Sequence, residues 1–159
     1  MLEFNQKGLL IPEAIITSSL DEFKNEFSIK LNDGKREELF NQYQQYCKDL
    51  KELCDNSELT QWIDGSYVTQ SKNPSDIDLV TLIDYNIVKA KETELIKFIF
   101  PQSMQTYQLD AYIIAVYPID NKSHFITQAD RSYWIDQFGK TKPNRSRKRH
   151  PKGFLEIII

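Results

Sequence analysis

The segment "PSDIDLVTLI", residues 74–83, constrains this chain most, because it sets two aspartates at the head of an apolar stretch. The β-branched residues favour a buried strand over about 76–83, whereas carboxylates are depleted from strands and rarely buried without a partner. Side chains alternate along a strand, so Asp76 and Asp78 should share one face, with Cα atoms about 7 Å apart. We expect their mutual repulsion to raise the pKa of at least one of them.

A bound divalent cation would compensate these charges, since Mg²⁺ is typically held by one or two carboxylates plus substrate phosphates. A third acid, Asp110, begins the β-branched and aromatic segment "DAYIIAVYP". If this strand neighbours 76–83, the three carboxylates converge on one face. Such a cluster suits a two-metal site that clamps the oxygens of a phosphoryl-type displacement.

Gly65 and Ser66 precede the first aspartate, with ten residues between Gly65 and Asp76. A residue without Cβ lets the backbone approach a phosphate closely, and serine offers both an N–H and a hydroxyl. Lys72, in the intervening loop, is a further candidate for contact with a nucleotide. Strand, Gly-Ser, loop and paired aspartates together indicate a phosphate and metal site.

Each of these residues also has an interpretation without a ligand. Asp76 would be a turn residue after Pro74 and Ser75, and Asp78 would form an ion pair with a lysine such as Lys72. Asp110 would cap a strand. Asp64 and Asp84 flank the motif without its strand-face geometry, so we interpret both as structural or solvated.

The chain has 159 residues, 40% of them hydrophobic, which predicts one globular domain over 1–159. We divide it into a helical N-terminal part (1–58), a core with the motif (59–118) and a C-terminal part (119–159). The expected fold class is α/β (α+β), with flanking helices on a mixed sheet of about four or five strands. Expected helices run from Ser18 or Ser19 to about 27 and over 35–54, 88–100 and 128–138 (capped by Gly139); expected strands lie near 60–64, 76–83, 108–118 and 153–159.

Three observations bear on cellular location. No apolar run approaches the ~18 residues of a membrane span, and the first residues do not resemble a secretory signal. Cys47 and Cys54 lie seven apart on one expected helix, which fits neither a zinc site nor a disulfide framework. We therefore expect a cytoplasmic protein with no membrane association.

The formal net charge of −3 hides an uneven distribution. Residues 140–152, "KTKPNRSRKRHPK", hold seven Lys or Arg and no acid. A basic block on an acidic body indicates an anionic partner such as phosphate, and the alternative is a solvated loop. Arginine's planar fork suits phosphate oxygens, so Arg145, Arg147 and Arg149 are candidates for nucleotide binding.

The order of these features resembles the polymerase-β-type nucleotidyltransferase superfamily, whose signature is G-S, a loop, D-h-D (h, hydrophobic) and a later third acid. The signature covers residues 62–118, and the stretch "GSYVTQSKNPSDIDL" is also similar to minimal nucleotidyltransferases. The fuller frame "WIDGSYVT…PSDIDLV…LDAYIIAVYP…KGFLEI" is similar to a bacterial family of nucleotidyltransferase-like proteins. The match departs at Gln70, where many minimal members have Gly or a basic residue.

The resemblance implies roles for the matching positions. Ser66 and the backbone after Gly65 would hold the terminal phosphates of a nucleotide. Asp76 and Asp78 would bind one or two Mg²⁺ ions, with Mn²⁺ as an alternative. Asp110 would be the third ligand and the general base.

The implied activity is transfer of a nucleoside monophosphate from an NTP such as ATP to a protein, RNA or small-molecule acceptor. A minimal enzyme of this kind suggests a protein partner, as in toxin–antitoxin operons. The alternative is a catalytically silent module that binds a nucleotide, RNA or a protein partner, for example an antitoxin-like component.

Overall fold

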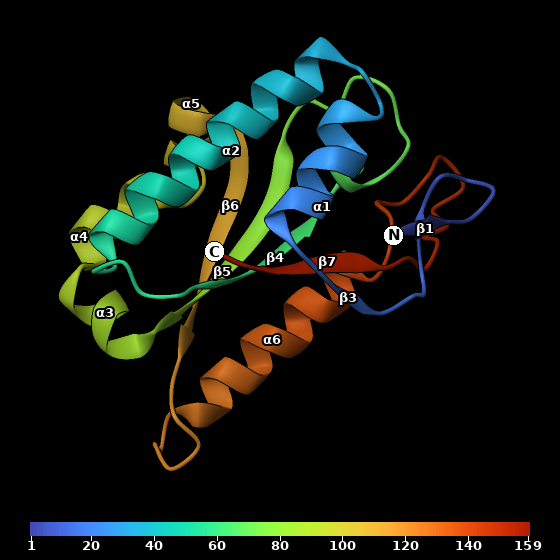
Figure 1. Cartoon of the computed structure of the whole chain (residues 1–159). Coiled ribbons are helices and arrows are strands. Elements are labelled where there is room, and N and C mark those ends of the chain that lie inside the picture. Colours follow the sequence, from blue (N-terminus) through green and yellow to red (C-terminus); the bar gives the residue numbers. More distant parts are fainter.

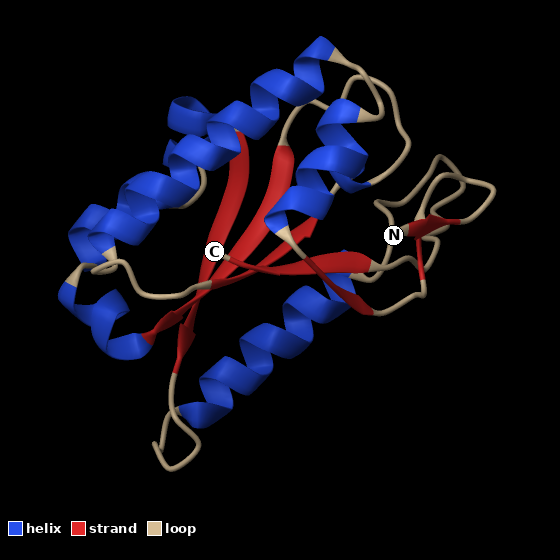
Figure 2. Ribbon diagram, in the orientation of Figure 1, coloured by secondary structure: helices blue, strands red, loops and turns tan.

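The computed structural model describes all 159 residues and has a five-stranded mixed sheet between two layers of helices (Figures 1 and 2). The strands are β1 (Glu3–Phe4), β2 (Leu10–Ile11), β3 (Ile15–Ser18), β4 (Thr60–Asp64), β5 (Ile77–Asp84), β6 (Leu109–Val116) and β7 (Phe154–Ile158). The helices are α1 (Leu20–Lys24), α2 (Gly34–Leu53), α3 (Tyr85–Ala90), α4 (Glu92–Leu95), α5 (Gln102–Tyr107) and α6 (His124–Phe138). The expected α/β class with a mixed sheet is confirmed.

The order of strands in the main sheet is β3-β7-β4-β5-β6. The outer pairs, β3 with β7 and β5 with β6, are parallel, and β4 is antiparallel to both of its neighbours. The last strand of the chain therefore lies inside the sheet, and all three parts of the sequence contribute strands to it. β1 and β2 form a separate two-stranded pair.

Helix α2 crosses one face of the sheet and makes the larger core (Figure 1). It begins where the carboxylate of Asp33 accepts a hydrogen bond from the Lys35 N–H, and it ends beside Cys54, so the predicted bounds are confirmed. Its buried apolar stripe consists of Leu39, Phe40, Tyr43, Tyr46, Cys47 and Leu50, which recur at helical spacing. This stripe packs on Ile77, Leu79 and Ile83 of β5, among other residues.

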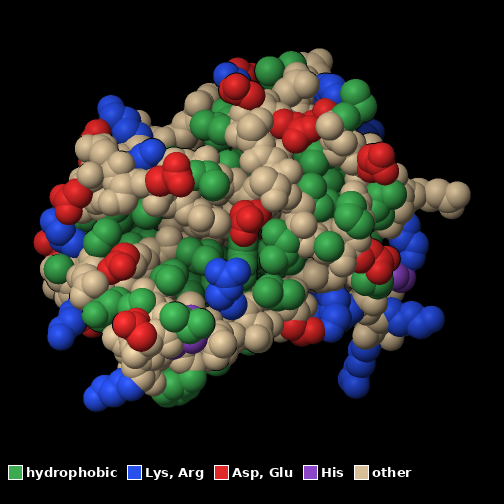
Figure 3. All heavy atoms as spheres, turned by 60° about the horizontal axis from the view of Figure 1, so that its bottom comes forward, with side chains coloured by type: hydrophobic (Ala, Val, Ile, Leu, Met, Phe, Trp, Pro, Cys, Tyr) green, Lys and Arg blue, Asp and Glu red, His purple; other side chains and the backbone are tan.

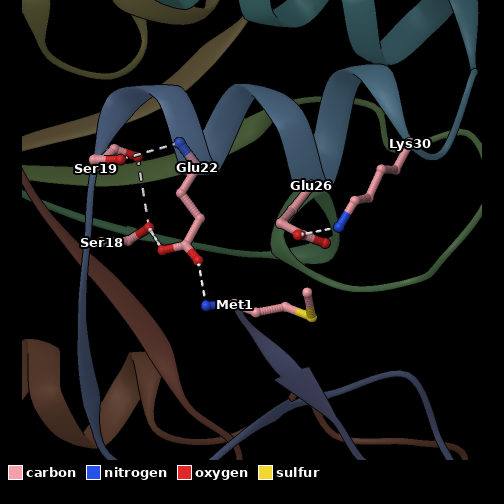
Figure 4. A network of polar contacts seen from close by, with 6 residues as sticks. All are labelled: Met1, Ser18, Ser19, Glu22, Glu26 and Lys30. Atoms are coloured by element: carbon pink, nitrogen blue, oxygen red, sulfur yellow. Dashed lines mark hydrogen bonds and ion pairs between the residues drawn. The ribbon is translucent and has the colours of Figure 1, made fainter.

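Helix α1 begins at the predicted cap (Figure 4). The Ser19 hydroxyl accepts a hydrogen bond from the Glu22 N–H at 3.1 Å. The Glu22 carboxylate in turn accepts a hydrogen bond from the Ser18 hydroxyl and pairs with the amino group of Met1 at 2.9 Å. The helix continues as a π-helical turn over Asn25–Ile29, which carries it beyond the predicted end.

Helix α6 covers the other face of the sheet with a smaller core that includes Trp62, Val80, Ile114, Phe138 and Phe154. Figure 3 turns this side of the molecule toward the viewer, and hydrophobic side chains reach the surface there between charged ones. The helix starts at His124, four residues before the predicted start, and ends as predicted at Gly139. No helix of the chain is both long enough and apolar enough to span a membrane.

The single helix predicted over 88–100 is wrong. The Asp84 carboxylate accepts a hydrogen bond from the Asn86 N–H and starts α3 early, and Lys91 leaves the helical conformation at φ −116°. Two short turns and α5 follow, divided at Pro101. Leu95 and Phe98 both pack into the α2 core, and such tertiary packing can override local helix propensity.

Arg36 of α2 is almost fully buried and holds the loop between β4 and β5. Its guanidinium donates to the carbonyl oxygens of Tyr67 (2.6 Å), Thr69 (3.0 Å) and Ser71 (2.6 Å). It also lies 5.0 Å from the centre of the Tyr67 ring. The buried carbonyl groups of an irregular loop thereby gain hydrogen-bond donors, as such groups require.

We predict that Arg36→Met lowers the free energy of unfolding by on the order of 3 kcal/mol, because several buried carbonyls lose their donor. Urea unfolding measures the change. Lys48→Met, on the exposed face of the same helix, is the matched control and should change stability little. Equal effects of the two substitutions on stability would contradict the proposed role of Arg36 in holding the loop between β4 and β5.

Candidate functional site

Three aspartates lie side by side at the ends of three neighbouring strands, β4, β5 and β6. Asp64 at the end of β4 pairs in register with Asp78 of β5, and Asp78 pairs with Asp110 of β6. Residues in register on adjacent strands project from the same face. Asp64, Asp78 and Asp110 therefore form a row, which we call the acidic row, on the face that α6 covers further along.

Asp76 lies just before β5, two residues from Asp78, and lines the same cavity as the acidic row. The predicted arrangement of the face is confirmed, since Val80 follows Asp78 into the core beneath α6. The structure therefore brings Asp76, Asp78 and Asp110 to one place, and it adds Asp64.

Gly65 carries the chain out of β4 directly over Asp78. Its φ is +80°, and a Cβ at this position would lie 1.8 Å from Oδ2 of Asp78. Both the backbone conformation and the missing side chain thus require glycine. The adjacent Ser66 is exposed and lines the cavity, as the prediction for a phosphate contact requires.

The acidic row forms part of the wall of a cavity of about 540 Å³, a size within the usual range for small-molecule sites. The charged and aromatic residues around it are Asp64, Asp76, Asp78 and Asp110; Lys140, Lys142, Arg149 and Lys152; and Tyr112, Tyr133, Trp134 and Phe138. Acids, cations and aromatic rings thus face one space. Phosphate, metal and planar groups are the ligands that such side chains bind.

Asp64 and Lys152 form a buried ion pair at one end of the acidic row. Lys152 immediately precedes the last strand, whose place beside β4 brings the ammonium group to Asp64. Burial raises the pKa of Asp64, and the Lys152 charge and hydrogen bond act against that rise. We interpreted Asp64 from the sequence as structural or solvated. The ion pair fits a structural role, whereas a solvated Asp64 is wrong because the side chain is buried.

Asp78, in the middle of the row, has its pKa raised to about 6. Burial is the largest cause, and the charges of Asp76, Asp64 and Asp110 add to it. Lys142 opposes the rise from 3.8 Å away, on a side chain that is 86% exposed. The predicted increase is therefore present at Asp78, with burial ahead of repulsion as its cause.

Asp110 closes the other end of the row. Its Oδ1 is the one buried side-chain oxygen or nitrogen without a hydrogen-bond partner. Burial, followed by the Asp110 carboxylate, raises the pKa of the neighbouring Tyr112 to about 12. A buried carboxylate oxygen without a donor is suited to a cation or a ligand hydroxyl.

The predicted cationic residues lie in different places. Lys72 lies outside the cavity, in a second hollow beside Arg36 and Asn73. Arg145 and Arg147 are exposed and do not line the cavity. The structure does not bring these three to the acidic row, because the loop turns outward at 143–148.

Arg149 does line the cavity, and it also fastens the loop. Its guanidinium donates to the carbonyl oxygens of Thr141 (2.9 Å) and Gln137 (3.2 Å). Lys140, Lys142 and Lys152, which we did not single out, are the other cations at this site. The alternation of side chains along the strand at 60–64 could have shown that Asp64 lies on the same face as Trp62. No local signal in the sequence predicts the pairing of Asp64 with Lys152.

Oxygen ligands are present for a divalent cation, but no three His, Cys, Asp or Glu side chains are grouped closely enough to form a complete metal site. The free Oδ1 of Asp110 and the crowded charge at Asp78 fit a cation that substrate phosphates help to hold. The residues therefore fit Mg²⁺ bound together with a phosphate better than Mg²⁺ bound alone.

A family model described as "Family of unknown function (DUF6932)" matches residues 2–158. The chain belongs to this family. No curated protein and no solved structure matches the chain.

We predict that Asp78→Asn stabilises the protein above pH 6. The pKa of about 6 in the folded protein exceeds the usual 3.8, so the free energy of unfolding falls as pH rises from about 4 to 6 and stays lower above that. The shift corresponds to about 2–3 kcal/mol, and asparagine cannot ionise and removes this loss.

Urea unfolding at pH 4 and pH 7.5 measures this dependence. Asp120→Asn, at an exposed position, is the control for removal of one negative charge. If the free energy of unfolding depends on pH in the same way for the wild type and Asp78→Asn, the raised pKa of Asp78 is contradicted.

We predict that Lys152→Met destabilises the protein by about 3–5 kcal/mol near pH 7, because it leaves the Asp64 charge buried without a partner. The loss should shrink at low pH, where Asp64 is protonated. The double variant Asp64→Asn/Lys152→Met should recover most of the stability. Thermal unfolding of the single and double variants measures the coupling, and additive losses would contradict a buried ion pair.

Proposed function

We propose that this protein is a Mg²⁺-dependent nucleotidyltransferase of the polymerase-β type. The observation that carries the proposal is the in-register pairing of Asp78 and Asp110, with the Gly65 turn directly over Asp78. The sequence motif would also be compatible with a fold in which these residues lie apart or point away from each other. Their arrangement in one cavity with Asp76 and Ser66 supports the proposal.

Carboxylates from the set Asp76, Asp78 and Asp110 would hold the cation together with substrate phosphates, and Mn²⁺ could replace Mg²⁺ among such oxygen ligands. When bound, the cation would neutralise negative charge on the phosphate oxygens. Ser66 offers its hydroxyl and N–H to the terminal phosphates from the exposed side of the turn. Lys142, close to Asp78 and in the same cavity lining, can also contact the phosphates.

The proposed reaction joins an acceptor oxygen to the α-phosphorus of an NTP. The bond between that phosphorus and its bridging oxygen breaks, and pyrophosphate leaves with the electron pair. Asp110 accepts the proton of the acceptor hydroxyl, since one of its oxygens has no other partner. The acceptor is a protein, an RNA end or a small molecule.

A second candidate is a silent module that binds a nucleotide or another anion without catalysis. The observation that favours it is the neutralisation of acids by lysines, above all Asp64 by Lys152. Intact Asp76, Asp78 and Asp110 favour the enzyme. The two candidates differ in one product, because only the enzyme releases pyrophosphate.

We predict that the wild type, with Mg²⁺ and α-³²P-labelled NTPs, transfers label to itself, to cellular RNA or to cellular protein, with release of pyrophosphate. Asp78→Asn and Asp110→Asn should each reduce the rate by at least 100-fold, since both remove a charged oxygen ligand. Activity should rise with pH through about 6, because Asp78 must be ionised to hold a cation.

Asp120→Asn is the control and should retain full activity. NTP binding without pyrophosphate release would support the silent module instead. Equal activity of Asp78→Asn and Asp120→Asn would contradict the proposed site.

A further inference from the structure

The aromatic side chains of the cavity have no role in the chemistry proposed above. Tyr112 follows Asp110 by two residues on the same face of β6, and Tyr133 and Trp134 come from α6. All three line the cavity with the acidic row. Their rings are in contact, with centroids 4.7 Å apart for Tyr112 and Trp134 and 5.2 Å apart for Tyr133 and Trp134.

Two of the three rings have a clear packing role. Tyr112 and Trp134 pack against the core beneath α6, and Trp134 also contacts Phe138. Tyr133 differs, because it is 57% exposed and yet borders the cavity. Packing explains a half-buried tryptophan, but it does not explain a large exposed ring beside it at the rim of a cavity.

We propose that a nucleobase stacks on the ring of Tyr133, which Trp134 supports edge-on at 81° and Tyr112 supports through its contact with Trp134. We call these three rings the platform. This inference rests on the proposed function and deepens it, since it assigns the base end of the nucleotide to particular residues. Aromatic rings bind bases through stacking, which every base can make. The platform therefore favours a nucleotide without selecting strongly among the four bases.

The spacing along β6 is consistent with this assignment. Two residues on one face of a strand are about 7 Å apart, which leaves room for a sugar between a base at the platform beside Tyr112 and a phosphate near Asp110. The Tyr112 hydroxyl can donate a hydrogen bond to a base or a sugar. One cavity thus offers contacts to each part of a nucleotide.

The test compares ligands with and without a base. We expect Tyr133→Ala to weaken the binding of ATP in the presence of Mg²⁺ by about 5- to 100-fold, the range expected for loss of one stacking contact. The binding of inorganic tripolyphosphate, which has no base, should stay unchanged. Isothermal titration calorimetry of the full chain measures both.

Phe125→Ala is the matched control, since Phe125 is an exposed aromatic residue of the same helix that does not line the cavity. It should leave both ligands unaffected, and Tyr133→Phe should restore the binding of ATP. ATP should also quench the fluorescence of Trp134 more than tripolyphosphate does. The chain has one other tryptophan, the buried Trp62, so Trp134→Phe identifies the source of the signal.

A short single-stranded oligonucleotide forms the third arm. Binding of the oligonucleotide but not of ATP, lost in Tyr133→Ala, would assign the platform to a base of an acceptor RNA. Equal weakening of ATP and tripolyphosphate, or no change for any ligand, would overturn the platform while the proposed function stands. If the wild type binds tripolyphosphate and Mg²⁺ but neither ATP nor the oligonucleotide more tightly, the platform is also wrong. If none of these ligands binds, the proposed function itself fails.

Discussion

The buried guanidinium of Arg36 is the interaction on which the arrangement of the site depends. The chain leaves β4 at Asp64 and rejoins the sheet at Ile77, and the segment between them has little regular structure in which to satisfy its carbonyl groups. Arg36 reaches this segment from α2 and donates to several of those groups. It cannot lose its charge readily, so the donors are always present. Ser66 and Asp76, at the two ends of the segment, are thereby held at one cavity.

The three carboxylates of the acidic row differ in how far neighbouring groups compensate their charges. Asp64 is neutralised by Lys152 inside the protein, so its carboxylate is already committed to the fold. Asp78 meets only an exposed lysine, Lys142, at 3.8 Å and holds a raised pKa. Asp110 keeps one buried oxygen without a partner. Capacity for a ligand therefore increases across the sheet from β4 to β6, and the proposed chemistry belongs at the β5 and β6 end.

Features set by nearby residues could be predicted from the sequence, whereas those set by distant contacts could not. The cap at Ser19, the buried stripe of α2 and the shared face of Asp78 and Val80 depend on short spacings. The pairing of Asp64 with Lys152 depends on β7 entering the sheet beside β4, which joins residues 88 positions apart. No periodicity carries that information. The prediction of one continuous helix after β5 failed for a related reason. Contacts with α2 outweigh local helix propensity there.

The position of the cavity follows from how far α6 extends along the sheet. The face of β5 and β6 beneath it changes from acidic to apolar within two residues, from Asp78 to Val80 and from Asp110 to Tyr112. Helix α6 packs on the apolar part, where Arg131 lies 5.0 Å from the centre of the Trp62 ring, and it ends at Phe138 beside the acids. The same boundary that ends hydrophobic packing therefore begins the cavity. The cavity lies where the aromatic rings at the end of a helix meet the carboxylates at the ends of strands. Neither group of side chains can bury the other fully.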